Sequence, residues 1–226
     1  MRLGLVCLLG CLLTLPGVGQ THYEGAIAVG GKAGITLSRV QFMPTVPQTM
    51  LPGFVAGAAV RYIEERHFGL IAELNVEQRG WKETFDGAPL AYQRRLTYLQ
   101  LPLLTHIFFG NNRLHGFFNA GPELGLMIAS GTSANFDIEH PESEADFPSV
   151  GHPADQFTLP VKKRFDYGLA AGLGMELFTQ HRHSLTLEGR FYYGLGDIFG
   201  NRKKDAFSAS SAMSIMVTLG YYYRVK

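Results

Sequence analysis

The final stretch of the chain, residues 211–226, alternates between apolar side chains and small or polar ones. The apolar row consists of Met213, Ile215, Val217, Leu219, Tyr221, Tyr223 and Val225. Successive side chains of a β-strand point to opposite faces, so the segment predicts a strand with one apolar face. A single strand of this kind would also fit a soluble β-sandwich. The other strands of the chain decide whether the apolar face is covered by protein or by lipid.

Seven earlier stretches show the same alternation. They are residues 29–39, 53–63, 68–81, 92–109, 114–130, 164–178 and 183–199. No helical pattern accompanies them to cover eight apolar faces, which indicates that these faces meet lipid. The fourth stretch contains Pro102, which cannot donate a ladder hydrogen bond and therefore predicts a bulge or local kink.

The connections between these stretches alternate in length. The second and third strands, the fourth and fifth, and the sixth and seventh are joined by about four residues each, whereas the other loops are long. The long loops are residues 40–52, 82–91, 131–163 and 200–210. Short periplasmic turns and long external loops are typical of outer-membrane barrels. We therefore predict an all-β, eight-stranded antiparallel up-and-down transmembrane β-barrel in a Gram-negative outer membrane, with both termini periplasmic.

The N-terminus predicts a signal peptide over residues 1–20, which leaves residues 21–226 as the barrel domain. Arg2 is followed by an apolar run over residues 3–15 that is short for a membrane span. Both cysteines, Cys7 and Cys11, lie inside this segment. Residues 8–11 also resemble a lipoprotein signal, but the apolar run continues past Cys11, which favours ordinary cleavage.

If the apolar rows face lipid, the opposite rows line the lumen. The charged residues in those rows are Lys32, Arg61, Glu73, Glu77, Arg79, Glu123, Asp166, Glu176, Glu188 and Arg190. An eight-stranded barrel is just wide enough to be filled by its own side chains, and buried charges are costly unless paired. We therefore predict a plug of mutually neutralised charges, with a narrow channel as the alternative.

A barrel enzyme that acts on lipid or peptide at the outer rim is a further alternative. The residues available for it are His140 and His152 with Ser143 or Ser149, beside the acidic residues Glu142, Glu144 and Asp146. No fixed spacing among them supports a catalytic triad. We assign no catalytic residue, no metal site and no cofactor. With 20 basic and 19 acidic residues the net charge is +1, which does not favour a nucleic-acid partner.

Aromatic residues near the predicted strand ends suggest two interfacial girdles. The girdle beside the short turns would contain Tyr62, Phe108, Phe109, Phe178 and Tyr221 to Tyr223. The girdle beside the long loops would contain Trp81, Phe85, Tyr92 and Phe199.

Several motifs resemble those of PorT-like outer-membrane barrels of the porin family. They are residues 30–34 (GGKAG), 98–104 (YLQLPLL), 120–125 (AGPELG), 167–169 (YGL), 171–174 (AGLG) and 219–221 (LGY). The resemblance spans essentially the whole mature chain and implies an eight-stranded outer-membrane barrel. Its namesake branch is similar to a component of type IX protein secretion. The expected partners are outer-membrane lipid and secretion-machine proteins, contacted through loop 131–163 or the periplasmic turns.

Overall fold

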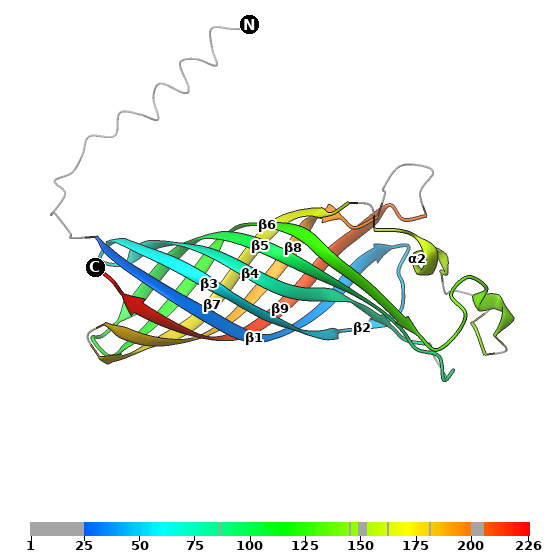
Figure 1. Cartoon of the computed structure of the whole chain (residues 1–226), viewed down its shortest axis with the longest axis horizontal. Coiled ribbons are helices and arrows are strands. Elements are labelled where there is room, and N and C mark those ends of the chain that lie inside the picture. The colour runs from blue at the N-terminus through cyan, green and yellow to red at the C-terminus, as the bar shows by residue number, and fades with distance from the viewer. Residues whose placement is uncertain are drawn as a thin grey trace, which may run out of the picture.

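The computed structural model describes residues 25–85, 87–144, 146–148, 153–161, 163–180, 182–199 and 206–226. It is a barrel of eight long antiparallel strands, with a two-residue strand beside its rim (Figure 1). The strands are β1 (Ala26–Met43), β2 (Gln48–Thr49), β3 (Leu51–Glu65), β4 (Phe68–Glu83), β5 (Tyr92–Gly110), β6 (Leu114–Ala134), β7 (Phe165–Gln180), β8 (His183–Asp197) and β9 (Ala209–Arg224). This confirms the predicted fold class. A 3-10 turn, Pro141–Ser143, and the one-turn helix α2, Asp155–Thr158, lie between β6 and β7. None of the helices in these ranges is long and apolar enough to cross a membrane.

The sheet closes on itself, so that every long strand has a partner on both sides. Its strand order is β2-β4-β3-β1-β9-β8-β7-β6-β5, and β4 pairs in addition with β5. The first and last long strands, β1 and β9, pair antiparallel from Ala28 opposite Arg224 to Met43 opposite Ala209. Closure leaves no open sheet edge along the wall, as a strand protein in lipid requires.

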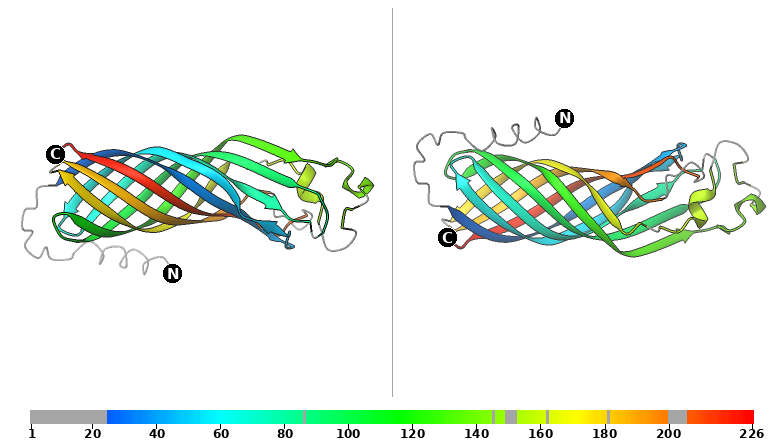
Figure 2. Two further views of the ribbon diagram at one scale, coloured as in Figure 1. Left: turned by 90° about the horizontal axis from the view of Figure 1, so that it is seen from below. Right: turned by 90° about the horizontal axis from the view of Figure 1, so that it is seen from above.

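The two ends of the barrel differ (Figures 1 and 2). At one end, which we call the turn end, tight turns join β3 to β4, β5 to β6 and β7 to β8, and β1 begins and β9 ends there. At the opposite end, which we call the loop end, the long connections emerge and α2 lies against the strand ends. The alternation of short and long connections is as predicted, but the strands extend into the predicted long loops: β1 ends at Met43, β4 at Glu83 and β6 only at Ala134.

Burial alternates along each strand, so each strand has an inward and an outward row. The outward row is apolar: Leu173 and Leu219, for example, are each 68 % exposed. The inward row is polar, and Thr36 and Glu77 are each 0 % exposed. The strands hold 15 to 21 residues, whereas about 9–11 suffice to cross the hydrocarbon layer. Near the loop end the outward positions of β1, β4 and β5 become polar, with Arg39, Lys82 and Gln93.

Of the two features predicted at Pro102, a bulge or a local kink, the bulge does not occur. Pairing of β4 with β5 pauses between Ala72 opposite Leu103 and Asn75 opposite Gln100, and it resumes in the same register. The missing proline N–H therefore interrupts the ladder without shifting it. The register shift of β5 lies instead between Thr97 and Tyr98, where it pairs with β6.

The girdle predicted at the turn end holds only in part. Tyr62, Phe109 and Tyr221 face outward and are 40 %, 64 % and 45 % exposed. Phe108 and Tyr222 are instead buried, at 7 % and 6 %. Phe108 is the neighbour of the outward Phe109, and Tyr222 is the neighbour of the outward Tyr221. Because neighbouring side chains of a strand point to opposite faces, Phe108 and Tyr222 point into the lumen.

The lipid-facing position of the outward rows predicts that a charge introduced there lowers the stability of the barrel. Leu187→Lys or Val217→Lys should each lower the free energy of unfolding by ~2–4 kcal/mol, because a lysine there would replace an apolar side chain near mid-bilayer. Urea unfolding in phospholipid vesicles measures this. The control is Met50→Lys between β2 and β3 at the loop end, which should cost at most ~1 kcal/mol. Equal, small effects at all three positions would contradict the lipid-facing assignment.

Candidate functional site

The barrel interior brings together all ten charged residues of the predicted lumen network. Each is less than one tenth exposed, and they occupy three levels along the barrel. The lower pair, nearest the turn end, is Arg61 with Glu176. The central cluster consists of Lys32, Glu73, Glu188 and Arg190. The upper cluster, toward the loop end, consists of Glu77, Arg79, Glu123 and Asp166.

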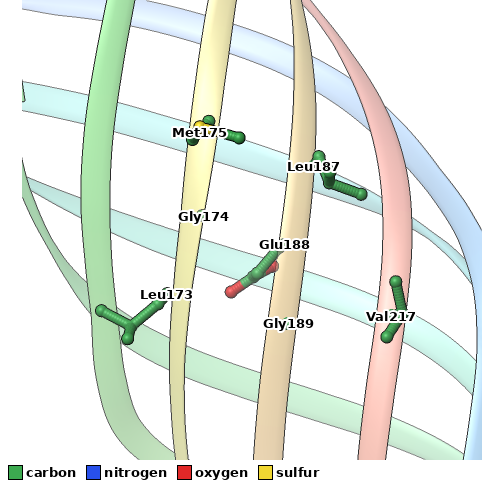
Figure 3. A pocket seen from close by; sticks show the side chains of 7 residues that line it. All are labelled: Leu173, Gly174, Met175, Leu187, Glu188, Gly189 and Val217. Carbon is green, nitrogen blue, oxygen red and sulfur yellow. The ribbon is translucent and has the colours of Figure 1, made fainter.

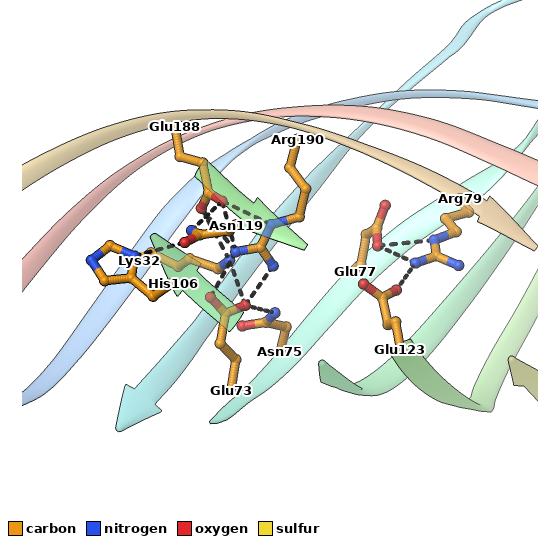
Figure 4. Close-up of polar contacts among 10 residues, drawn as sticks. All are labelled: Lys32, Glu73, Asn75, Glu77, Arg79, His106, Asn119, Glu123, Glu188 and Arg190. Carbon is orange, nitrogen blue, oxygen red and sulfur yellow. Dashed lines mark hydrogen bonds and ion pairs between the residues drawn. The ribbon is translucent and has the colours of Figure 1, made fainter. Parts of the chain in front are cut away.

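The central cluster joins β1, β4 and β8 (Figure 4). Arg190 donates to both oxygens of Glu73, at 2.7 and 2.8 Å, and its Nη2 lies 2.8 Å from Glu188 Oε2. Lys32 Nζ lies 2.6 Å from Glu73 Oε2 and 3.9 Å from Glu188 Oε2. Two cations face two carboxylates, so the cluster is neutral.

Neutral polar side chains hydrogen-bond to the two carboxylates of the central cluster. Asn75 Nδ2 donates to Glu73 at 2.9 Å, and Asn119 Nδ2 donates to Glu188 at 2.8 Å. Asn119 Oδ1 in turn lies 2.7 Å from His106 Nδ1. These amides hold the carboxylates in place, and sequence analysis assigned none of them to a particular partner.

The lower pair is also balanced. Arg61 Nη1 and Nη2 donate to the two oxygens of Glu176 at 2.8 and 2.6 Å, and Ser184 Oγ donates to the same carboxylate at 2.5 Å. The Arg61 guanidinium also lies 4.5 Å from the centre of the Tyr222 ring. The bidentate geometry and the aromatic face account for the depth at which this arginine is buried.

The upper cluster is not balanced, because three carboxylates share one guanidinium. Arg79 donates to Glu77 at 2.9 Å, to Asp166 at 3.2 Å and to Glu123, and it stacks 3.7 Å from the Tyr192 ring centre. Figure 4 shows Glu77 and Glu123 both turned toward Arg79. Glu77 Oε1 and Glu123 Oε2 are buried without a hydrogen-bond partner in the described part of the chain.

Above the upper cluster, aromatic side chains fill the mouth of the barrel. We call this group the mouth cluster, and it consists of Phe42, Trp81, Tyr92, Phe157, Phe199 and Phe207. Phe157 comes from α2, and its ring centre lies 4.6 Å from that of Tyr92. Trp81 is 0 % exposed and packs edge-on against Phe42 at 5.3 Å. Helix α2 therefore covers the mouth from the loop side.

The mouth cluster corrects the girdle predicted at the loop end. Trp81, Phe85, Tyr92 and Phe199 are all buried rather than lipid-facing. The strands continue beyond the apolar belt, so an aromatic residue near a strand end need not lie at the membrane interface. The alternation along β4 could have predicted that Trp81 faces inward, because Trp81 shares the inward row of β4 with Glu77 and Arg79.

Polar contacts fasten α2 over the mouth. Gln156 Nε2 donates to Glu83 Oε2 at 3.0 Å, and Trp81 Nε1 donates to Glu83 Oε1 at 2.9 Å. Arg94 Nη1 donates to the carbonyl of Leu159 at 2.7 Å. A segment that the sequence presents only as a polar loop is thus anchored to the inner wall of the barrel.

The residues considered for a rim enzyme do not form a catalytic arrangement within the described ranges. His140 Nδ1 lies 3.6 Å from Glu142 Oε1, and both side chains are exposed. Ser143 Oγ donates to the backbone carbonyl of His140 at 2.7 Å, not to its ring. Ser149 and His152 lie outside the described residues, as does the predicted signal peptide. No group of three His, Cys, Asp or Glu side chains that could hold a metal ion occurs in the described ranges.

A shallow pocket of about 380 Å³ on the barrel wall was not predicted (Figure 3). It is lined by Leu173, Gly174, Met175, Leu187, Glu188, Gly189 and Val217. Gly189 lies in the outward row of β8 and pairs with Leu173 and Val217, both exposed. The absence of a side chain at Gly189 therefore leaves a hollow among its apolar neighbours.

Together, the closed sheet, the outward apolar belt and the charged lumen define an integral membrane β-barrel. The model of the family described as outer membrane protein beta-barrel domain matches residues 19–200. The chain therefore belongs to this family and is an outer-membrane β-barrel protein.

Solved barrels of low sequence identity resemble it. Neisserial surface protein A is 11 % identical, with 89 % of this chain and 99 % of that chain covered and a TM-score of 0.44. OprG from Pseudomonas aeruginosa is 12 % identical, with 90 % and 97 % covered and a TM-score of 0.49. Ail of Yersinia pestis is 13 % identical, with 89 % and 100 % covered and a TM-score of 0.40. No curated protein matches the chain.

The charge balance of the clusters predicts opposite effects for two chemically identical substitutions. Glu73→Gln should lower the free energy of unfolding by ~3–5 kcal/mol, because it leaves Lys32 and Arg190 with one carboxylate between them. Glu123→Gln should be close to neutral or stabilising, because it relieves crowding of three carboxylates around Arg79. Urea unfolding of both variants in vesicles measures the difference. A larger loss for Glu123→Gln would contradict this account of the interior.

Proposed function

We propose that the protein is a closed, non-enzymatic barrel that acts as a structural or interaction component of the outer membrane. The observation that carries this proposal is the filled interior: charge clusters occupy three levels of the lumen, and the mouth cluster with α2 covers the loop end. A barrel blocked in this way is suited to presenting surfaces rather than to passing solutes. In the orientation we propose, the short turns and both termini are periplasmic, and loop 131–163 is external.

The proposed binding surface is the external part of loop 131–163. Asp137, Glu139 and Glu142 are exposed there, while Phe136 and Phe147 pack toward the mouth cluster. The loop is therefore fixed at its aromatic side and presents carboxylates outward. Loops held on a rigid scaffold commonly carry binding functions.

Type IX-like protein secretion is the process we propose for this surface. The proposal rests on the resemblance of residues 98–104 and 120–125, among other motifs, to PorT-like barrels. A secretion-machine subunit would then contact either loop 131–163 or the periplasmic turns.

Conductance tests the blocked lumen. We expect the full-length protein in planar bilayers to give no single-channel steps, because charged side chains at three levels and the packed rings of the mouth cluster occupy the lumen. Phe157→Ala should remain silent, since it loosens the mouth cluster but leaves the clusters below it intact. Regular steps whose ion selectivity changes in Glu123→Gln would instead establish a narrow channel.

Partner capture tests the interaction role. Gentle-detergent purification of the tagged protein from its own outer membrane, followed by mass spectrometry, should recover secretion-machine subunits. Asp137→Asn, Glu139→Gln and Glu142→Gln combined should reduce recovery if the loop is the contact. Glu64→Gln with Glu65→Gln is the control at the turn end. If only the control variant loses the secretion-machine subunits, the contact is made by the periplasmic turns. If the barrel protein is recovered without any other protein, a stable partnership is contradicted.

A further inference from the structure

The turn end carries five exposed cations, which we call the basic ring. They are Arg66, Arg113, Arg182, Arg224 and Lys226. Each of the three tight turns supplies one arginine, and the end of β9 and the residues after it supply the other two cations. A cation in every turn is a repeated feature of the structure that the lumen clusters do not explain.

Backbone hydrogen bonds link the turns and chain ends into one rim. These are Phe108 N to His67 O (3.1 Å), Phe178 N to Arg113 O (2.9 Å), Arg224 N to Arg182 O (2.8 Å) and Ile27 N to Lys226 O (3.0 Å). Each bond ties a residue of the basic ring, or its immediate neighbour, to an adjoining strand. The five cations are therefore held around a single rim at fixed positions of the backbone.

The basic ring has a surplus of positive charge. The exposed acidic side chains of the described residues at this end are Glu64 and Glu65, two against five basic side chains. Within the described part of the chain, no side chain of the ring forms an ion pair or a hydrogen bond. Among the described residues, therefore, none neutralises these five side chains.

Aromatic residues set the level of the ring relative to the membrane. Each turn arginine follows an aromatic residue by four positions: Tyr62 precedes Arg66, Phe109 precedes Arg113, and Phe178 precedes Arg182. Tyr62 and Phe109 face outward, and such side chains settle at the membrane–water interface. Phe178, which was also predicted for the girdle, instead shares the inward row of β7 with Glu176. The arginines lie just beyond that level, and their long side chains can reach the headgroups.

We propose that the basic ring binds the phosphate groups of anionic phospholipids. The planar guanidinium matches phosphate geometry with two parallel hydrogen bonds, and the membrane surface supplies phosphate at the level of the ring. In the orientation proposed above, these lipids belong to the periplasmic leaflet. The inference goes beyond the interaction role and does not depend on it, because it requires no protein partner.

Lipid retention tests the proposal. The full-length protein is reconstituted in vesicles of equal phosphatidylglycerol and phosphatidylcholine, extracted gently, and its retained lipids are counted by native mass spectrometry. We expect phosphatidylglycerol to be enriched, and the enrichment to fall with added salt. Replacing Arg66, Arg113, Arg182 and Arg224 with Gln should remove it, at roughly fivefold in affinity per arginine. Replacing the same four with Lys should give an intermediate enrichment, because lysine keeps the charge but cannot form two parallel hydrogen bonds to one phosphate.

The control removes the same charge from the loop end, through Arg39→Gln, Lys82→Gln, Lys163→Gln and Arg164→Gln, all at exposed positions. It should leave the enrichment unchanged. Equal retention of both lipids by the unmodified protein would overturn the proposal, as would equal losses in the ring and control variants. The heat-dependent gel mobility of each variant establishes that its barrel is folded before lipids are counted.

Discussion

The pairing of backbone groups in a solvent without hydrogen bonds is the constraint on which the rest of this structure depends. Lipid offers no partner to an N–H or C=O group, so every strand must have two neighbours and the sheet must close. Pairing of β1 with β9 and of β4 with β5 achieves this. Closure with eight strands then fixes a narrow interior that side chains have to fill.

Filling that interior with charge makes electrostatic balance a structural requirement. The lower pair and central cluster are balanced, and each carboxylate there has a cation within 3 Å. The upper cluster departs from this pattern, with three carboxylates on Arg79, and it lies next to the aromatic mouth cluster. The imbalance therefore lies on the loop-end side of the lumen, directly beneath the aromatic mouth cluster.

Alternation in the sequence was sufficient to predict the strands, their inward and outward rows and the closed barrel. It was not sufficient to predict where the membrane ends along each strand, and so Trp81 was assigned to lipid although its row faces inward. The ion pairs could not be predicted either. Arg61 and Glu176 lie 115 positions apart, on strands that do not pair with each other, and their contact depends on the tilt and stagger of the closed barrel. The sequence also did not predict that α2 covers the mouth of the barrel, because Gln156 and Phe157 are held there by contacts with residues far away in the sequence.

The seam between β1 and β9 has a consequence for how the chain reaches its final state. β1 pairs with β9, which follows the other strands of the barrel in chain order, so one edge of β1 has no partner until β9 has been synthesised. An exposed strand edge with an apolar row invites association with other chains. Contacts between such distant segments also form slowly. We therefore expect this chain to need protection against aggregation throughout its passage to the membrane, and insertion to finish only when β9 arrives.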